Sequence, residues 1–226
     1  MLTKKDIIFE DNHLLIINKE SGMLVQGDKT GDECLADEAK SYIKRVYDKP
    51  GDVFLGVVHR LDRPVSGAVV LARTSKALER MNKLFKDREV DKTYWAITTH
   101  RPPNTEGELV HWIKKNTKIN KSTAFNKDVS GSQKAILSYK LVGRIAEYYL
   151  LEIKLMTGRP HQIRVQLAKV GCSILGDVKY GAAKPGRDGR IYLHSRYLSF
   201  IHPVKKEKMS VTARVPNDQI WNLFNS

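Results

Sequence analysis

One aspartate lies between two arginines in the stretch HRLDRPVSG, which runs from His59 to Gly67. An ionised carboxylate can act as a nucleophile or a base, so Asp62 could carry out chemistry between Arg60 and Arg63. It could equally be a loop-capping group, because aspartate side chains accept hydrogen bonds from nearby backbone amides in turns. The stretch alone leaves both interpretations open.

Other polar residues stand in otherwise apolar stretches of the chain: Tyr94, Arg159, His161 and Arg164. Taken singly, each has a structural explanation. A strand tyrosine commonly buries its ring with the hydroxyl satisfied, and a helix arginine can extend into water. His161 could simply pack near a helix start. Together with Asp62 and Arg60, however, these residues suggest a site for an anion-rich substrate that contains a flat ring.

Several common catalytic motifs are missing from the chain. There is no GxxxxGK[ST] loop, no GxGxxG after a strand, no HExxH and no GxSxG. These absences argue against P-loop, dinucleotide, zinc-protease and nucleophile-elbow chemistry. The two cysteines, Cys34 and Cys172, cannot form a four-ligand zinc site or a disulfide framework. The sequence therefore does not indicate a catalytic metal.

The candidate residues lie on or beside three expected elements. VFLGVVH from Val53 and GAVVLA from Gly67 read as buried strands, which places HRLDRPVS in the loop between them. KTYWAITT from Lys92 is an alternating strand that carries Tyr94. TGRPHQIRVQLAKVG reads as a helix with Pro160 in its first turn and Gly171 at its C-terminal cap.

The rest of the chain mixes strands and helices without a regular repeat. Strands are expected at 7–9, 14–18, 134–143 and 147–156, and helices at 35–47 and after Thr74 or Ser75. Residues 101–133 are polar and rich in lysine, and could form either a mobile RNA-contacting arm or a solvated hairpin. The pattern predicts one α+β domain, which could have two lobes.

The net charge of +14 and the pI near 9.7 suit a polyanionic partner, namely RNA, DNA or anionic lipid, but the charge could equally serve only to keep the protein soluble. The N-terminus lacks the apolar run of a signal peptide, and no stretch approaches the length of a membrane span. We expect a cytoplasmic protein.

The motifs HRLDRPVSG, KTYWAI and TGRPHQIRVQLAKVGCSILGDVKYG resemble, in order and spacing, those of the RluA family of RNA pseudouridine synthases. FEDNHLLIINKESGMLV and HSRYLSFIHP resemble the family's first and last segments. The resemblance implies the pseudouridine synthase fold, an α+β fold with a central mixed, mostly antiparallel β-sheet flanked by helices and loops. It implies a single catalytic domain over residues 1–226, without a separate S4-type RNA-binding domain.

The resemblance also implies an activity, the isomerisation of uridine in structured RNA to pseudouridine, without a cofactor or a metal. Asp62 is the implied catalytic residue, as nucleophile at C1′ or base at C2′. Tyr94 would stack on the uracil and Arg164 would pair with Asp62. Arg60 would fill the gap left by the flipped uridine. Further RNA-binding residues are expected at the following positions: Arg159, His161 and Lys92.

Some positions depart from the family pattern: Glu20, Val65, Gln166 and Cys172-Ser173. None removes a catalytic group, but they leave the target RNA open, with ribosomal RNA preferred to transfer RNA. Asp177 is expected to be structural. We expect a monomer that binds RNA and neither DNA nor membranes. The alternatives are a catalytically inactive RNA-binding protein or RNA chaperone on the same fold, and an N-glycosidase that releases uracil.

Overall fold

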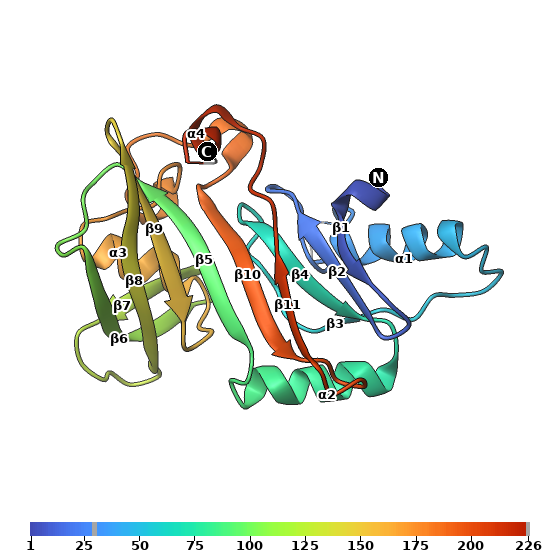
Figure 1. The fold of residues 1–226 in the computed structure, drawn as a ribbon. Helices are drawn as coiled ribbons and strands as arrows, with labels where there is room; N and C mark the ends of the chain where they lie inside the picture. Colours follow the sequence, from blue (N-terminus) through green and yellow to red (C-terminus); the bar gives the residue numbers. More distant parts are fainter. Residues whose placement is uncertain (29–30, 225–226) are drawn as a thin grey trace. The chain divides into compact units, whose positions relative to one another are not determined.

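The computed structural model describes residues 1–28 and 31–224 (Figure 1). The chain forms two compact units. Unit 1 comprises Met1–Val90 and Ser195–Val215, and unit 2 comprises Asp91–His194 and the segment from Pro216 on. The prediction of a single domain over the whole chain stays a prediction. Each unit is described by itself.

Unit 1 is built on a sheet in which β1, β2, β4 and β10 are neighbours in this order, with β11 beside β10 and the short β3 beside β4. Its described pairs are antiparallel. The elements are η1 (Lys4–Asp6), β1 (Ile7–Glu10), β2 (Leu14–Lys19), α1 (Leu35–Val46), β3 (Gly56–Val57), β4 (Ser66–Ala72), α2 (Ser75–Lys86), β10 (Leu193–Ile201, in unit 1 from Ser195) and β11 (Lys208–Thr212).

Two apolar runs explain the centre of this sheet. LLII at the start of β2 and all of β4 are buried, as is expected of strands that are covered on both faces. Helix α2 begins after Thr74, whose hydroxyl accepts a hydrogen bond from the amide of Ala77 at 3.1 Å. α2 packs against β4 and β3, and its Met81 reaches the core of this unit.

The structure explains why position 67 of the HRLDRPVSG motif is a glycine. Its φ is +115°, and a Cβ atom there would lie 2.4 Å from the backbone oxygen of Ser195 on β10. Only glycine permits this approach of the two strands. The glycine therefore lets the start of β4, directly after the Asp62 loop, pack closely against β10.

Unit 2 contains a second antiparallel series with the strand order β5, β9, β8, β6 and β7. Helix α3 packs against β6 and β7 (Figure 1). The elements are β5 (Asp91–Thr98), β6 (Glu106–Asn116), β7 (Lys121–Phe125), β8 (Gln133–Ile145), β9 (Tyr148–Leu155), α3 (Gln162–Lys169), η2 (Val178–Tyr180), η3 (Arg187–Gly189) and α4 (Gln219–Asn222).

The α+β class and the mostly antiparallel sheet predicted from the sequence are confirmed. The long strand predicted from Val53 is wrong, since only Gly56 and Val57 pair with β4. β2 pairs along one edge of β4 and β10 is the neighbour on the other, which leaves little of β4 for β3. Phe54 is accordingly exposed.

Two further local expectations are resolved. Helix α3 begins at Gln162, so Pro160 precedes the helix instead of lying in its first turn. His161 is the N-cap residue and adopts the left-handed conformation with φ of 56°, which separates the TGRPH loop from the helix. The lysine-rich segment was expected to be either a mobile arm or a hairpin. In the structure β6 and β7 pair antiparallel, so it is a hairpin.

Candidate functional site

Backbone contacts from a distant segment hold the loop that carries Asp62. The carbonyl oxygen of Arg63 accepts from the amide of Gly22 at 2.8 Å, and that of Pro64 accepts from the Ser21 hydroxyl at 2.8 Å. The carbonyl of Asp62 accepts from the amide of Val65 at 3.0 Å. The half-buried Asp62 therefore sits on a braced turn, as a reacting carboxylate requires.

Lys19 is buried at the end of β2, with 1% of its surface exposed. Its Nζ donates to the carbonyls of Glu20 at 2.8 Å, Met23 at 2.9 Å and Arg63 at 3.3 Å. Burial lowers the pKa of Lys19 from its ordinary 10.5 to about 7, and the negative charge of Asp62 acts in the opposite direction. Lys19 thus couples electrostatically to Asp62 and braces the same loop.

The neighbours of Asp62 in the motif differ in role. Arg60 is exposed. Arg63 donates to the carbonyl of Gly22 and forms an ion pair with Asp32 at 2.7 Å, so it also braces the loop. Nε2 of His59 accepts from the amide of Val70 at 3.1 Å, and its ring stacks on a phenylalanine, so His59 is structural.

In unit 2, β5 carries Lys92 and Tyr94 on the same face, because residues two apart in a strand point the same way. Tyr94 is buried with 7% of its surface exposed, whereas Lys92 is half-buried. Tyr94 lies opposite Ile153 on β9. Strand pairing therefore fixes the position of its backbone.

The Arg164 side chain on α3 is held by Asp177. Its Nε and Nη2 donate to the two carboxylate oxygens at 2.7 and 2.9 Å, and both residues are buried. The guanidinium also lies over the Tyr180 ring, 5.0 Å from the centroid. A bidentate pair of this kind fixes the plane of the arginine as well as its place.

His161 belongs to the same network. The hydroxyl oxygen of Tyr180 accepts from the amide of Ser122 at 2.8 Å and lies 2.7 Å from Nδ1 of His161. Burial raises the pKa of Tyr180, so the hydroxyl is protonated at neutral pH. It can therefore donate a hydrogen bond to Nδ1. The His161 ring is thereby oriented at the start of α3.

The TGRPH loop is fixed by the buried side chain of Gln162. Its Oε1 accepts from the Thr157 hydroxyl at 2.8 Å and from the Arg159 amide at 3.0 Å, while its Nε2 donates to the carbonyl of Ile136. Nε of Arg159 donates to the carbonyl of Lys134 at 3.0 Å. Arg159, His161 and Arg164 therefore gather at the N-terminal end of α3.

The predicted site residues fall into two sets. Asp62 and Arg60 belong to unit 1, whereas Lys92, Tyr94, Arg159, His161 and Arg164 belong to unit 2. The pairing of Arg164 with Asp62 that the resemblance implied stays a prediction.

Sequence reasoning missed several residues of these networks, among them Lys19, Gln162 and Tyr180. Lys19 has one local signal, a lysine that ends the apolar run LLIIN, and Tyr180 has none beyond its place in the long third motif. Asp177 was expected to be structural. In the structure it forms an ion pair with Arg164.

Neither a metal site nor a membrane span is found in residues 1–28 and 31–224. No group of three or more His, Cys, Asp or Glu residues there is arranged to hold a metal ion. Within the same ranges, no helix is long and apolar enough to cross a membrane.

Comparison with known proteins points to one family. The sequence profile described as RNA pseudouridylate synthase matches residues 13–169. The chain is 30% identical to ribosomal large subunit pseudouridine synthase D of Zymomonas mobilis, over 94% of this chain and 70% of that protein. It is 31% identical to ribosomal large subunit pseudouridine synthase C of Rickettsia bellii, over 96% and 70%.

A solved structure agrees with these sequence matches. The structure of human RNA pseudouridylate synthase domain containing 4 matches with a TM-score of 0.80 and 26% identity. The match covers 97% of this chain and 92% of the human chain.

Proposed function

Because this chain belongs to the RNA pseudouridylate synthase family, a family of isomerases, we propose that it converts uridine in structured RNA to pseudouridine with Asp62 as the catalytic residue. The resemblance recognised in the motifs is confirmed at the level of the family. RNA is the substrate class of pseudouridine synthases, and the net charge of +14 suits it.

The observation that carries the catalytic assignment is the bracing of the Asp62 loop. Lys19, Ser21 and Gly22 all donate to carbonyls of Arg63 and Pro64, which directly follow Asp62. Preorganisation of this kind removes the need to order the reacting group when the substrate binds. A loop whose only task is to connect two strands does not require a buried lysine beneath it.

The proposed reaction rearranges one nucleotide without gain or loss of atoms. The N1–C1′ bond breaks, the uracil turns and C5 bonds to C1′, while the C5 proton leaves and N1 gains a proton. Asp62 acts as a nucleophile at C1′ or as a base at C2′. Tyr94 offers a ring face for the uracil.

The remaining residues act on the RNA. A uridine in a stem must leave the base stack before C1′ is accessible, at a cost of a few kcal/mol. We propose that the exposed Arg60 fills the gap that the flipped uridine leaves in the stem. We also propose that Lys92, Arg159 and His161 contact the RNA. Arginine serves this role well because it both stacks and binds phosphate.

We propose large-subunit ribosomal RNA as the target, with transfer RNA as the second choice. Two relatives carry ribosomal large subunit in their names, which supports this order. Mapping pseudouridines in RNA from a strain that lacks the gene tests it. A site missing from large-subunit RNA is expected, and a site missing only from transfer RNA would reverse the order.

The activity itself is tested by release of tritium from RNA labelled at C5 of uridine. The purified protein is expected to release label without any added metal or cofactor. An absence of release from every cellular RNA fraction would favour a non-catalytic RNA-binding protein. Mass spectrometry separates isomerisation, which leaves the RNA mass unchanged, from an N-glycosidase, which leaves abasic RNA.

A further inference from the structure

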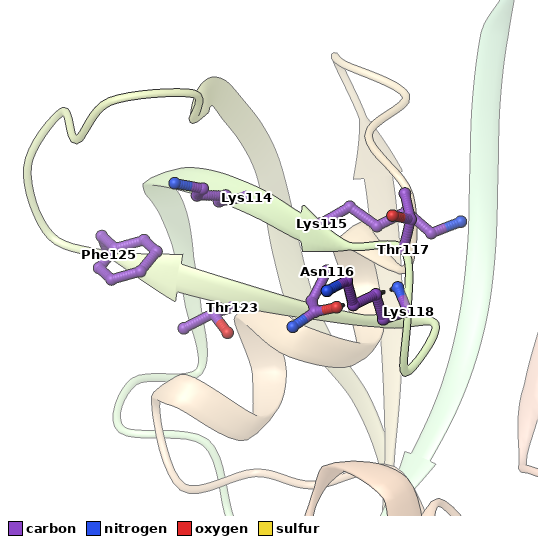
Figure 2. A pocket seen from close by; sticks show the side chains of 7 residues that line it. All are labelled: Lys114, Lys115, Asn116, Thr117, Lys118, Thr123 and Phe125. Carbon is purple, nitrogen blue, oxygen red and sulfur yellow. Dashed lines mark hydrogen bonds between the residues drawn. The ribbon is translucent and has the colours of Figure 1, made fainter.

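The hairpin of β6 and β7 in unit 2 contains a hollow of about 520 Å³ (Figure 2). Three lysines line it, Lys114, Lys115 and Lys118, together with Asn116, two threonines and Phe125. Figure 2 shows that these side chains come from both strands of the hairpin and from the turn between them. None of them belongs to the catalytic motifs.

The hollow is strongly cationic. From His111 to Lys127 the chain has five lysines and no aspartate or glutamate. Lys115 and Lys118 are exposed, whereas Lys114 donates from Nζ to the carbonyl of Ser130 at 2.8 Å. A concentration of like charges is unfavourable in the free protein and favours binding of a polyanion, which releases counter-ions.

The hairpin is anchored within unit 2 by buried side chains of both strands. Ile113 and Ala124 are buried against Val165 of α3 and against Tyr180. The hydroxyl of Ser122 on β7 donates to the carbonyl of Pro160 at 2.8 Å. The hairpin is thus tied to the loop that carries Arg159 and His161.

The turn of the hairpin is also ordered. Oδ1 of Asn116 accepts from the amides of Lys118 at 3.0 Å and Ile119 at 3.4 Å, and Asn120 takes the left-handed conformation with φ of 45°. An asparagine that bonds its own turn holds the loop without help from a ligand. The backbone of the turn is therefore ordered before anything binds, so ordering it adds little to the free-energy cost of binding.

We propose that this hollow binds a single-stranded part of the RNA substrate, with Lys115 and Lys118 on phosphates and Phe125 beneath an unpaired base. The inference rests on the proposed function and names a second contact region of the same substrate. Lysines next to a half-buried aromatic ring match single-stranded nucleic acid, which offers phosphates and base faces together. A flat anionic membrane would use the charge but leave the concave surface and the ring unfilled.

The test compares two double variants in the full chain. Lys115→Gln/Lys118→Gln removes two charges at the hollow, and Lys76→Gln/Lys86→Gln removes two exposed charges on α2 as the control. Affinity is measured by fluorescence anisotropy with a labelled single-stranded RNA of about twenty nucleotides at several salt concentrations. Thermal unfolding confirms that each variant is folded, and Lys118→Gln alone replaces the hollow pair if that pair unfolds.

The hollow pair is expected to weaken RNA affinity about ten-fold at about 0.1 M salt. It should also lower the salt slope by about 0.7 for each phosphate that a lysine no longer neutralises. The RNA affinity of the control variant Lys76→Gln/Lys86→Gln should stay within about two-fold of that of the parent protein. Phe125→Leu should weaken affinity about five-fold with an unchanged salt slope, because it removes stacking and no charge.

Equal losses of affinity in the two pairs, or no loss in either, would overturn the inference. A hollow pair that keeps RNA affinity but no longer binds phosphatidylglycerol vesicles would assign the hollow to a membrane instead. The proposed function is judged separately by tritium release at saturating RNA. A parent protein that binds RNA through the hollow but releases no label would therefore contradict the function alone.

Discussion

Arg164 and Asp177 form a buried two-point ion pair, with Nε and Nη2 of the arginine 2.7 and 2.9 Å from the two carboxylate oxygens. Only 6% of Arg164 and 1% of Asp177 is exposed. With two of its nitrogens fixed and its face over Tyr180, the guanidinium has one orientation. Asp177 thereby positions Arg164, a residue to which the family resemblance assigns a place in the catalytic site.

Asp177→Asn removes the charge and keeps the shape of this partner. We expect the free energy of unfolding to fall by about 3–5 kcal/mol, because the buried arginine loses the charge of the carboxylate that accepts two of its hydrogen bonds. We also expect a lower kcat, since the guanidinium is no longer oriented. Chemical denaturation and tritium release measure the two effects.

The control is Asp188→Asn, which breaks the ion pair of the exposed Asp188 with the half-buried Arg190 in the same unit. This substitution should lower the free energy of unfolding by less than about 1 kcal/mol and leave turnover unchanged. Unchanged turnover in Asp177→Asn would show that the buried pair does not position Arg164, and unchanged stability would show that the pair does not stabilise the fold.

Asp62→Asn tests the catalytic carboxylate. Turnover is expected to fall by more than about 1,000-fold because the amide is neither a nucleophile nor a base, while folding and RNA affinity stay close to those of the parent. Tritium release and RNA anisotropy measure the two properties. Asp52→Asn, an exposed loop aspartate, is the matched control. Near-normal turnover in Asp62→Asn would remove the assignment.

The lowered pKa of Lys19 predicts that the stability of the protein depends on pH. Its pKa is about 7 in the folded protein and near 10.5 in the unfolded chain, so between these values the unfolded state binds more protons. The contribution of Lys19 to the free energy of unfolding therefore increases as pH rises from about 7 toward 10.5. Lys19→Met should remove this part of the increase.

Denaturation of Lys19→Met and the parent at several pH values measures the difference. Lys44→Met, an exposed lysine on α1, is the control and should leave the pH profile of the parent unchanged. Parallel profiles for Lys19→Met and the parent would mean that Lys19 titrates normally.

Tyr94→Phe keeps the ring face and removes the hydroxyl. If the hydroxyl helps to remove the C5 proton, kcat falls by more than RNA affinity does. Tyr94→Leu removes the face as well, and stacking losses of about 1–3 kcal/mol should then appear in binding. Single-turnover tritium release and anisotropy separate the two contributions. An unchanged kcat in Tyr94→Phe would limit Tyr94 to stacking.

Much of the fold could be predicted from local patterns. The apolar runs of β2 and β4 and the helical spacing in α1 each identify their element, because burial imposes a period on the chain. β3 could not be predicted correctly, since its length depends on which edge of β4 is left open. That is a property of the assembled sheet.

By itself, the sequence determined the family, the α+β class and the chemical types of the candidate residues, because these lie in contiguous motifs. The tertiary structure alone decided which residues support them. Lys19 reaches the carbonyl of Arg63 across 44 residues, and Asp177 reaches Arg164 across 13. Contacts of this kind leave no periodic trace in the chain, because they depend on how separate elements pack.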